Sequence, residues 1–138
     1  MPIARFRAVA LLLALVAGVT TGCGTGDDRE QARGVVERFY DAVRQDQGAT
    51  ACEQLSESTL QQLESQTEQQ CDQVITRLDV EGGAVVDAHV YVLNADVELS
   101  SGEHAFLSRE RGGWRISALA CSPEGPPHER PMDCEVEA

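Results

Sequence analysis

The sequence has no lysine, no hydrophobic stretch long enough to span a membrane, and none of the common catalytic motifs. All 11 basic residues are arginine, which indicates, with the abundance of Ala, Val and Gly, a high-GC coding bias rather than a chemical requirement. No G-x-S-x-G, phosphate-binding loop, H-E-x-x-H or EF-hand spacing occurs. The chain therefore carries no signature of the corresponding hydrolase, nucleotide-binding, zinc-protease or calcium-binding classes, and we expect no cofactor.

The longest apolar run lies close to the N-terminus. It covers residues 8–19 and follows two arginines, and the polar or small residues 20–22 end it. The run is therefore shorter than the about 20 apolar residues that a transmembrane helix needs. A basic start, a short apolar run and small residues at its end are typical of an export signal. We therefore expect this run to direct the protein out of the cytoplasm and then to be removed.

A cysteine follows the apolar run directly. Cys23, preceded by Thr21 and Gly22, resembles the modified cysteine of a bacterial lipobox, although Thr20 departs from the Leu or Val usual there. Two acyl chains on one cysteine are enough for stable anchoring. We expect residues 1–22 to be a lipoprotein signal peptide and lipid on Cys23 to hold the protein at the outer face of the cell membrane. An ordinary secretory signal with a chance cysteine is the alternative.

Acidic residues dominate the rest of the chain. Cleavage before Cys23 leaves 116 residues (138 minus 22), enough for one domain with a modest core. The leader contains two of the 11 arginines and none of the 23 acids, so the mature chain has a net charge of 9 minus 23, or −14. Such a surface repels phosphate and anionic headgroups. Nucleic acid is therefore not an expected partner, and the lipid itself must supply the membrane anchoring.

Four cysteines remain after Cys23. An even number in a small exported domain predicts two disulfides. Of the three pairings we favour the sequential one, because it closes short loops within neighbouring elements and each bridge adds about 3 kcal/mol of stability. No C-x-x-C pair occurs and no His lies near a Cys at zinc-ligand spacing, so no metal site is expected. The favoured bridges join Cys52 to Cys71 and Cys121 to Cys134.

The first half of the mature chain has the periodicity of helices. Apolar residues three or four positions apart predict a first helix over residues 29–45. A second helix is predicted over 59–67, capped by Ser56 or Ser58. A third is predicted over 71–78, and the first bridge would staple these two short helices together.

The period of the apolar residues changes to two after residue 83. Four strands joined by short turns predict an antiparallel meander. The Pro- and acid-rich residues 122–138 cannot build a core of their own, and the second bridge would fold them against the last strand. The predicted fold is therefore α+β, with three helices on a curved four-stranded meander over 29–121, a tether over 23–28 and a tied tail. In the first strand, the expected inward-facing residues are Val86, Ala88, Val90 and Val92.

A set of residues spread over the predicted elements carries a resemblance to a known family. They are Val36, Phe39 and Tyr40 in the first helix, then Ala51, Cys52, Leu60, Leu63, Cys71, Gly112, Gly113, Trp114, Ala120, Cys121, Asp133, Cys134, Glu135 and Val136. With them, three helices followed by a curved meander resemble the cone-shaped α+β fold of the nuclear-transport-factor-like, or SnoaL-like, superfamily. The chain is also similar to small actinobacterial envelope lipoproteins of that shape. These relatives are mostly without an assigned activity, so the resemblance implies a fold and a location more than a function.

The resemblance also implies a place for catalysis. Enzymes of this cone fold use an acid, a His or a Tyr inside the cone to move a proton or to orient a water molecule. Asp87, His89 and Tyr91 lie on one side of the first predicted strand and are the candidate group. We favour the alternative that they form the solvent face of this strand. His104 and His128 have no partner in the sequence.

Three hypotheses for function follow. The leading one is a membrane-anchored extracytoplasmic lipoprotein that acts as a non-catalytic binding or accessory module of the cell envelope, with a small-molecule or protein ligand in a concave pocket. The second is a small extracytoplasmic enzyme of isomerase or hydrolase type. The third is a purely structural envelope protein.

Overall fold

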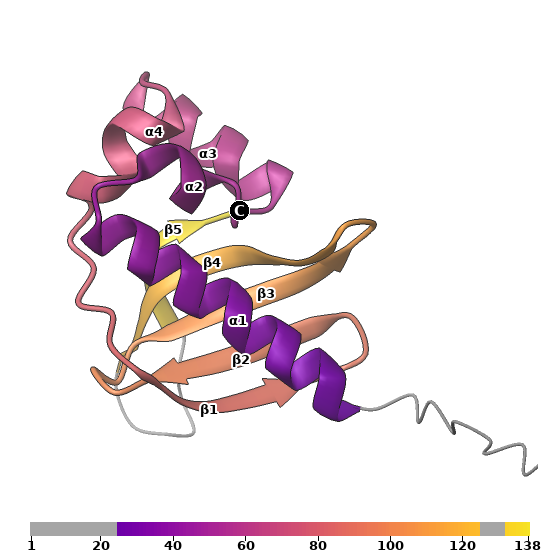
Figure 1. The fold of residues 1–138 in the computed structure, drawn as a ribbon. Coiled ribbons are helices and arrows are strands. Elements are labelled where there is room, and N and C mark those ends of the chain that lie inside the picture. The colour runs from indigo at the N-terminus through magenta and orange to yellow at the C-terminus, as the bar shows by residue number, and fades with distance from the viewer. Residues whose placement is uncertain (1–24, 125–131) are drawn as a thin grey trace, which may run out of the picture.

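The structure, a computed structural model, describes residues 25–124 and 132–138. Within these residues, helices precede a five-stranded antiparallel sheet, which confirms the α+β class (Figure 1). The helical elements are α1 (Thr25–Arg44), α2 (Gly48–Cys52), α3 (Glu57–Thr67), α4 (Cys71–Val74) and the 3-10 helix η1 (Ile75–Arg77). The strands are β1 (Val85–Val90), β2 (Asn94–Leu99), β3 (His104–Glu110), β4 (Gly113–Pro123) and β5 (Met132–Glu137).

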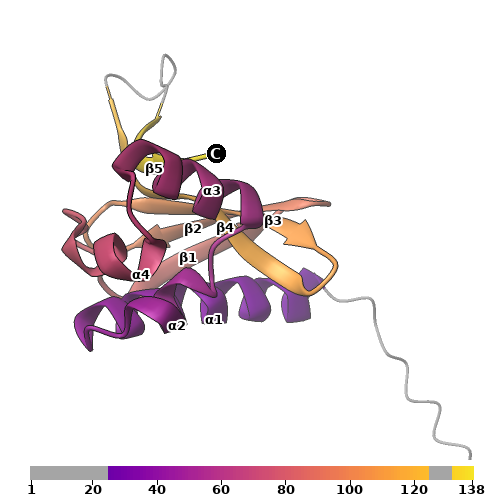
Figure 2. The same ribbon diagram turned by 90° about the horizontal axis from the view of Figure 1, so that it is seen from above.

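Helix α1 lies along one face of the sheet and supplies one side of the core (Figure 2). It begins earlier than predicted, at Thr25, because Asp27 and Asp28 fall inside its first turn. Carboxylates are favourable there, since the N-terminal end of a helix carries a partial positive charge. None of the helices in the described part of the chain is long and apolar enough to cross a membrane.

The short helices α2, α3 and α4 gather at the end where α1 finishes (Figure 1). Helix α2 was not predicted, because five residues are too few to show a helical period. A Cβ atom on Gly48 would stand 2.3 Å from the carbonyl oxygen of Asp72, so only glycine allows α2 to approach α4 this closely. The predicted disulfide between Cys52 and Cys71 joins the same two helices.

Helix α3 is capped by Ser56, the first of the two predicted candidates. The Ser56 hydroxyl accepts a hydrogen bond from the backbone N–H of Thr59 at 3.1 Å. The Thr59 hydroxyl in turn donates to the carbonyl oxygen of Ser117 in β4, at 2.9 Å. The cap therefore also fixes α3 against the sheet.

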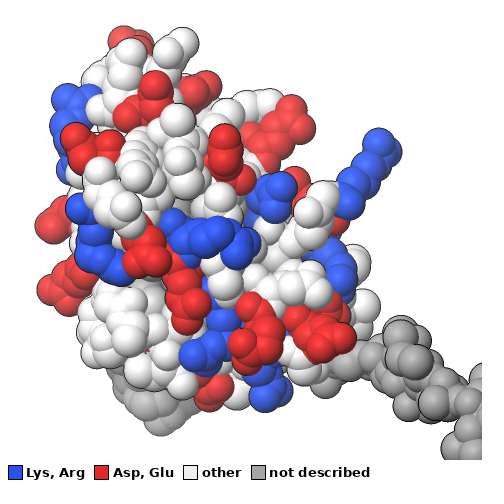
Figure 3. Space-filling model, viewed as in Figure 1, with Lys and Arg blue, Asp and Glu red and all other residues white. Residues whose placement is uncertain are grey.

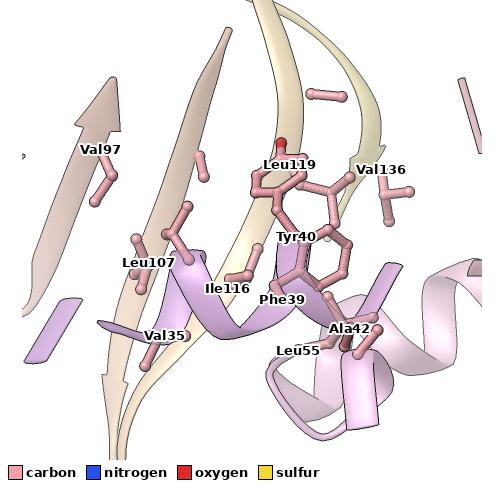
Figure 4. Close-up of a cluster of buried hydrophobic side chains, with 14 of the residues drawn as sticks. Val35, Phe39, Tyr40, Ala42, Leu55, Val97, Leu107, Ile116, Leu119 and Val136 are labelled. Atoms are coloured by element: carbon pink, nitrogen blue, oxygen red, sulfur yellow. The ribbon is translucent and has the colours of Figure 1, made fainter. Parts of the chain in front are cut away.

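The sheet is a meander in which each strand pairs with the next in sequence, from β1 to β5. Its core face packs on α1 and buries large side chains from both layers. Figure 4 shows Phe39 and Tyr40 of α1 among these side chains. The largest fully buried residues include Trp114, Phe39, Leu63, Ile75, Leu99, Leu107, Ile116 and Leu119.

Two positions of the first strand differ from the predicted alternation. Val86 was expected to face inward, but it is 53% exposed. The register of β1 on β2 shifts between Val85 and Asp87, and this bulge turns the intervening side chain outward. Val92 was also expected inside, yet it lies in the turn after β1 and is 89% exposed. The strand therefore ends before the pattern predicts.

The sheet has five strands rather than the predicted four. Strand β5 pairs with β4, and the predicted disulfide joins Cys121 and Cys134 directly across this ladder. Val136, at 1% exposure, adds its side chain to the core. The fifth strand was not predicted because one inward-facing valine among acidic and proline residues does not form an alternating apolar pattern. The pairing protects an edge of β4 that would otherwise be open to other chains.

Candidate functional site

The candidate catalytic residues Asp87, His89 and Tyr91, for which we favoured a place on the solvent face of the first strand, do not enclose a cavity. The side chains of Asp87 and His89 are each more than half exposed, with His89 Nε2 3.1 Å from Asp87 Oδ2. Tyr91 is 61% exposed and follows the end of β1. A proton-transfer site relies on a positioned and partly dehydrated base, and this pair lies in open solvent.

The structure gives His104 a partner that the sequence did not reveal. Its Nδ1 lies 2.7 Å from Asp96 Oδ1, because β2 and β3 bring the two residues together across the ladder. The imidazole also stacks on Phe106, with 6.3 Å between the ring centres. The pair is on the sheet face opposite to α1, where it stabilises the ladder. Cys23 and His128 lie outside the described residues.

A cleft of about 520 Å³ opens at the other end of the strands from the β1–β2 turn. Three segments form its walls: the chain just before β1, the β2–β3 turn, and the paired ends of β4 and β5. This volume lies in the range of small-molecule sites. None of the cleft's described lining residues is basic, and we call it the acidic cleft. Five of the lining residues are carboxylates: Asp79, Glu81, Glu103, Asp133 and Glu135.

Glu103 is the buried carboxylate of the acidic cleft, with 7% exposure. Its two oxygens accept hydrogen bonds from the backbone N–H groups of Glu81, at 3.1 Å, and of Gly82, at 2.8 Å. Hydrogen bonds to an ionised group are stronger than neutral ones. Glu103 therefore ties the segment before β1 to the β2–β3 turn and fixes the inner wall of the cleft.

The hydroxyl of Tyr40 reaches this wall from the core and points toward β4 (Figure 4). It lies beside the Glu103 carboxylate and the backbone of Ala120, yet it makes no hydrogen bond of ordinary geometry. Burial raises the pKa of Tyr40 and the negative charge of Glu103 raises it further, so the hydroxyl stays neutral. Tyr40 therefore links the core to the carboxylate that fixes the inner wall of the cleft.

Ala120, which also lines the acidic cleft, has a strained backbone. Its φ of +52° lies in the left-handed region, which residues with a Cβ seldom adopt. The strain coincides with a shift in the register of β4 on β3, between the pairs Ala118–Phe106 and Cys121–His104. Such strain persists where the surrounding structure enforces it, and it is frequent at binding sites.

The second disulfide places two of the carboxylates. Asp133 and Glu135 flank Cys134, and the bridge to Cys121 holds this part of β5 beside the end of β4. Without the bridge, repulsion between like charges would drive these two acidic residues away from the other three. The described residues contain no group of three or more His, Cys, Asp or Glu side chains that could hold one metal ion. The carboxylates instead surround a space of small-molecule size.

Sequence reasoning missed this site, although one signal was present. Ala105 and Leu107 point inward in β3, and Glu103 occupies the preceding position of the same alternation. A charged residue at an inward-facing position requires buried partners, and this requirement marks Glu103. No local pattern indicates that Asp79 and Asp133 approach it, since they come from distant parts of the chain.

The chain was compared with family models, curated proteins and solved structures, and none of the three comparisons finds a match.

Proposed function

We propose that this protein is a lipid-anchored module of the extracytoplasmic cell envelope that binds a cationic ligand in the acidic cleft and carries out no catalysis. The observation that supports the ligand class is the lining of the cleft, five carboxylates without a basic residue among its described positions. Carboxylates gathered around a concave surface attract positive charge before any contact is made. The ligand is therefore an organic cation or a basic segment of another protein.

The location rests on two features of the chain. Lipid on Cys23 would attach the protein to the membrane, as the lipobox-like sequence predicts. The two disulfides support an oxidising compartment outside the cytoplasm. An envelope lipoprotein of the cone-shaped superfamily is consistent with both.

The geometry favours binding over the two other hypotheses. The exposed positions of Asp87, His89 and Tyr91 do not provide an enclosed reaction space. A purely structural role does not account for five carboxylates gathered around one concave surface, because their mutual repulsion lowers stability.

Binding is tested with a fluorescently labelled hexa-arginine peptide and the full chain extracted from membranes in mild detergent. Fluorescence anisotropy at low ionic strength should show saturable binding that weakens as salt is added, because salt screens exposed charges. Absence of saturable binding to this peptide and to spermine would overturn the cationic ligand class.

A pair of matched variants locates the binding. Asp79→Asn with Glu135→Gln removes two charges from the cleft and should weaken peptide binding about tenfold, since each exposed ion pair contributes up to about 1 kcal/mol. The control, Glu53→Gln with Glu98→Gln, removes two charges from exposed positions outside the cleft lining. Equal weakening in both variants would show that net charge, and not the cleft, attracts the peptide.

The anchor is tested separately by the intact mass of the protein purified from membranes without reductant. We expect a chain that begins at Cys23, carries a diacylglycerol and lacks four hydrogens relative to the reduced form. An unlipidated chain cut at another position would contradict lipid attachment at Cys23. It would not bear on ligand binding in the cleft, which the peptide experiment tests.

A further inference from the structure

The β1–β2 turn presents three consecutive exposed apolar residues. Tyr91 is 61%, Val92 89% and Leu93 61% exposed, and together they form what we call the apolar tip. Backbone hydrogen bonds between Tyr91 and Asn94 close the turn around the other two residues. Turn positions usually carry Gly, Asn, Asp, Ser or Pro. Large apolar side chains there serve neither the turn nor the core, and therefore indicate contact with something outside the domain.

The apolar tip lies beside the start of α1. The backbone N–H of Arg109 donates to the Leu93 carbonyl oxygen at 2.9 Å, and the Arg109 guanidinium forms an ion pair with Asp28 of the first turn of α1 at 2.7 Å. One arginine thus connects the tip with the beginning of the helix. Figures 1 and 2 both show the start of α1 and the β1–β2 turn at the same end of the domain.

The position of the start of α1 decides which surface the tip meets. Cys23 precedes Thr25 by two residues, and two residues of chain span at most about 7 Å. Lipid on Cys23 would therefore hold this end of the domain at the membrane surface. The reach is too short for the anchor to place the tip far from the bilayer.

The distribution of charge agrees with this orientation. The apolar tip contains no charged residue, and Arg111 is exposed in the neighbouring β3–β4 turn. On the α1 side of the molecule acidic and basic side chains are interspersed, also at the end where α1 begins (Figure 3). The acidic cleft lies at the opposite end of the strands. Asp27 and Asp28 also lie at the end where α1 begins, and Arg109 pairs with Asp28. This end therefore carries charges of both signs, whereas the acidic cleft faces away from the membrane.

We infer that the apolar tip inserts into the outer leaflet of the membrane and is a second attachment point beside the lipid on Cys23. The inference rests on the anchor of the proposed function. Tyr is well suited to the interface, since its ring is apolar and its hydroxyl remains hydrated. A domain held at two points keeps one orientation, and the acidic cleft stays open toward the periplasmic or external space.

The test uses the full lipidated chain reconstituted into vesicles of phosphatidylcholine with a minority of phosphatidylglycerol. Tyr91→Trp places a reporter in the tip, and brominated lipids should reduce its emission about twofold or more, because bromine quenches only tryptophan at bilayer depth. Ser101→Trp, in the β2–β3 turn at the opposite end, is the matched control and should not be quenched. The native Trp114 is buried and provides a constant background.

A second pair of variants tests the tip itself. Adding Val92→Ser and Leu93→Ser to the Tyr91→Trp reporter should remove the quenching, whereas adding Val86→Ser, an exposed valine outside the turn, should leave it unchanged. Unchanged quenching in the first combination overturns insertion by these side chains. Equal quenching of the two reporters, or none, on a chain whose mass shows the lipid also overturns the inference while the anchor stands. A chain without lipid is recognised from its mass alone and overturns the anchor instead.

Discussion

Gly82 allows the inner wall of the acidic cleft to form. Its φ is +64°, and a Cβ atom at this position would stand 2.6 Å from the Tyr40 ring. Its backbone N–H also donates to Glu103 at 2.8 Å. One residue therefore combines a left-handed backbone, a close ring contact and a hydrogen bond to the buried carboxylate, and no side chain fits all three.

We expect Gly82→Ala to lower the free energy of unfolding by about 2–4 kcal/mol, from backbone strain together with the clash. The control is Gly102→Ala in the β2–β3 turn, where φ is +89° and no other atom lies within 4 Å of the place that the added methyl group would take. This control should lose only about 1–2 kcal/mol, from the backbone alone. Urea unfolding of both variants measures the difference. Equal losses would mean that Tyr40 moves aside without penalty.

Asp28 makes part of the stability pH-dependent. The hydrogen bond from Arg109, with its positive charge, holds the pKa of Asp28 below its usual value of 3.8, although partial burial acts in the opposite direction. A carboxyl group with a lowered folded pKa contributes stability that is fully present above its unfolded pKa. This contribution is lost as the pH falls through the folded pKa.

The stability difference between the wild type and Asp28→Asn should therefore be present at neutral pH and shrink below about pH 4. Urea unfolding between acidic and neutral pH measures it, and carboxyl NMR should show the Asp28 midpoint rising in Arg109→Leu. Asp27→Asn is the control, since it removes the same charge from another position of the same turn. An unaltered Asp28 midpoint in Arg109→Leu would show that the arginine is not the cause.

Among the elements, β5 depends most on a single covalent bond. Only Val136 of this strand is fully buried, and the Cys121–Cys134 bridge crosses its ladder with β4. A strand with so little apolar area gains much of its stability from the lower entropy of the cross-linked unfolded chain. The edge of β4, the position of Asp133 and one wall of the cleft all depend on it.

We expect Cys121→Ser with Cys134→Ser to lower the free energy of unfolding by about 3 kcal/mol. The variant should also lose hydrogen-exchange protection in β5 and along the outer edge of β4, and it should self-associate through that edge. Cys52→Ser with Cys71→Ser, the control, should lose a similar free energy while β5 stays protected. Unchanged exchange in β5 of the first variant would show that the backbone ladder alone holds the strand.

At the scale of the whole molecule, negative charge opposes folding. The residues from Cys23 onward have a net charge of 9 minus 23, or −14, and five carboxylates converge on one cleft. Repulsion among them destabilises the compact state, and dissolved salt screens it. The same negative charge would attract a cation to the cleft.

The melting temperature of the full chain should therefore rise by a few degrees between about 20 mM and about 300 mM NaCl. The rise should be smaller in Asp79→Asn with Glu135→Gln than in the control Glu53→Gln with Glu98→Gln, because only the first pair relieves the cleft. Differential scanning calorimetry measures both. A melting temperature that falls with salt would mean that attractive ion pairs, such as Asp28 with Arg109, outweigh the repulsion.

The sequence by itself determined the class of the fold and the order of its elements. The apolar stripe through Phe39 and Tyr40 predicts α1, and the alternation around Leu107 predicts a buried strand, because both patterns arise within one element. The number and positions of the cysteines favoured the two bridges that the structure contains. Helix α2 and strand β5 escaped prediction, since neither is long or apolar enough to show a period of its own.

Only the tertiary structure decided the candidate site and the exposure of the apolar tip. Glu103 and Asp133 are far apart in sequence, and they line one cleft because β5 pairs with β4 and the second bridge joins the two strands. Tyr40 reaches Glu103 from a third distant segment, helix α1. The exposure of Val92 likewise depends on where the β1–β2 turn falls, which the bulge in β1 and the pairing with β2 set. Local sequence patterns indicate which side chains are suited to burial, whereas contacts between distant segments decide which side chains are buried.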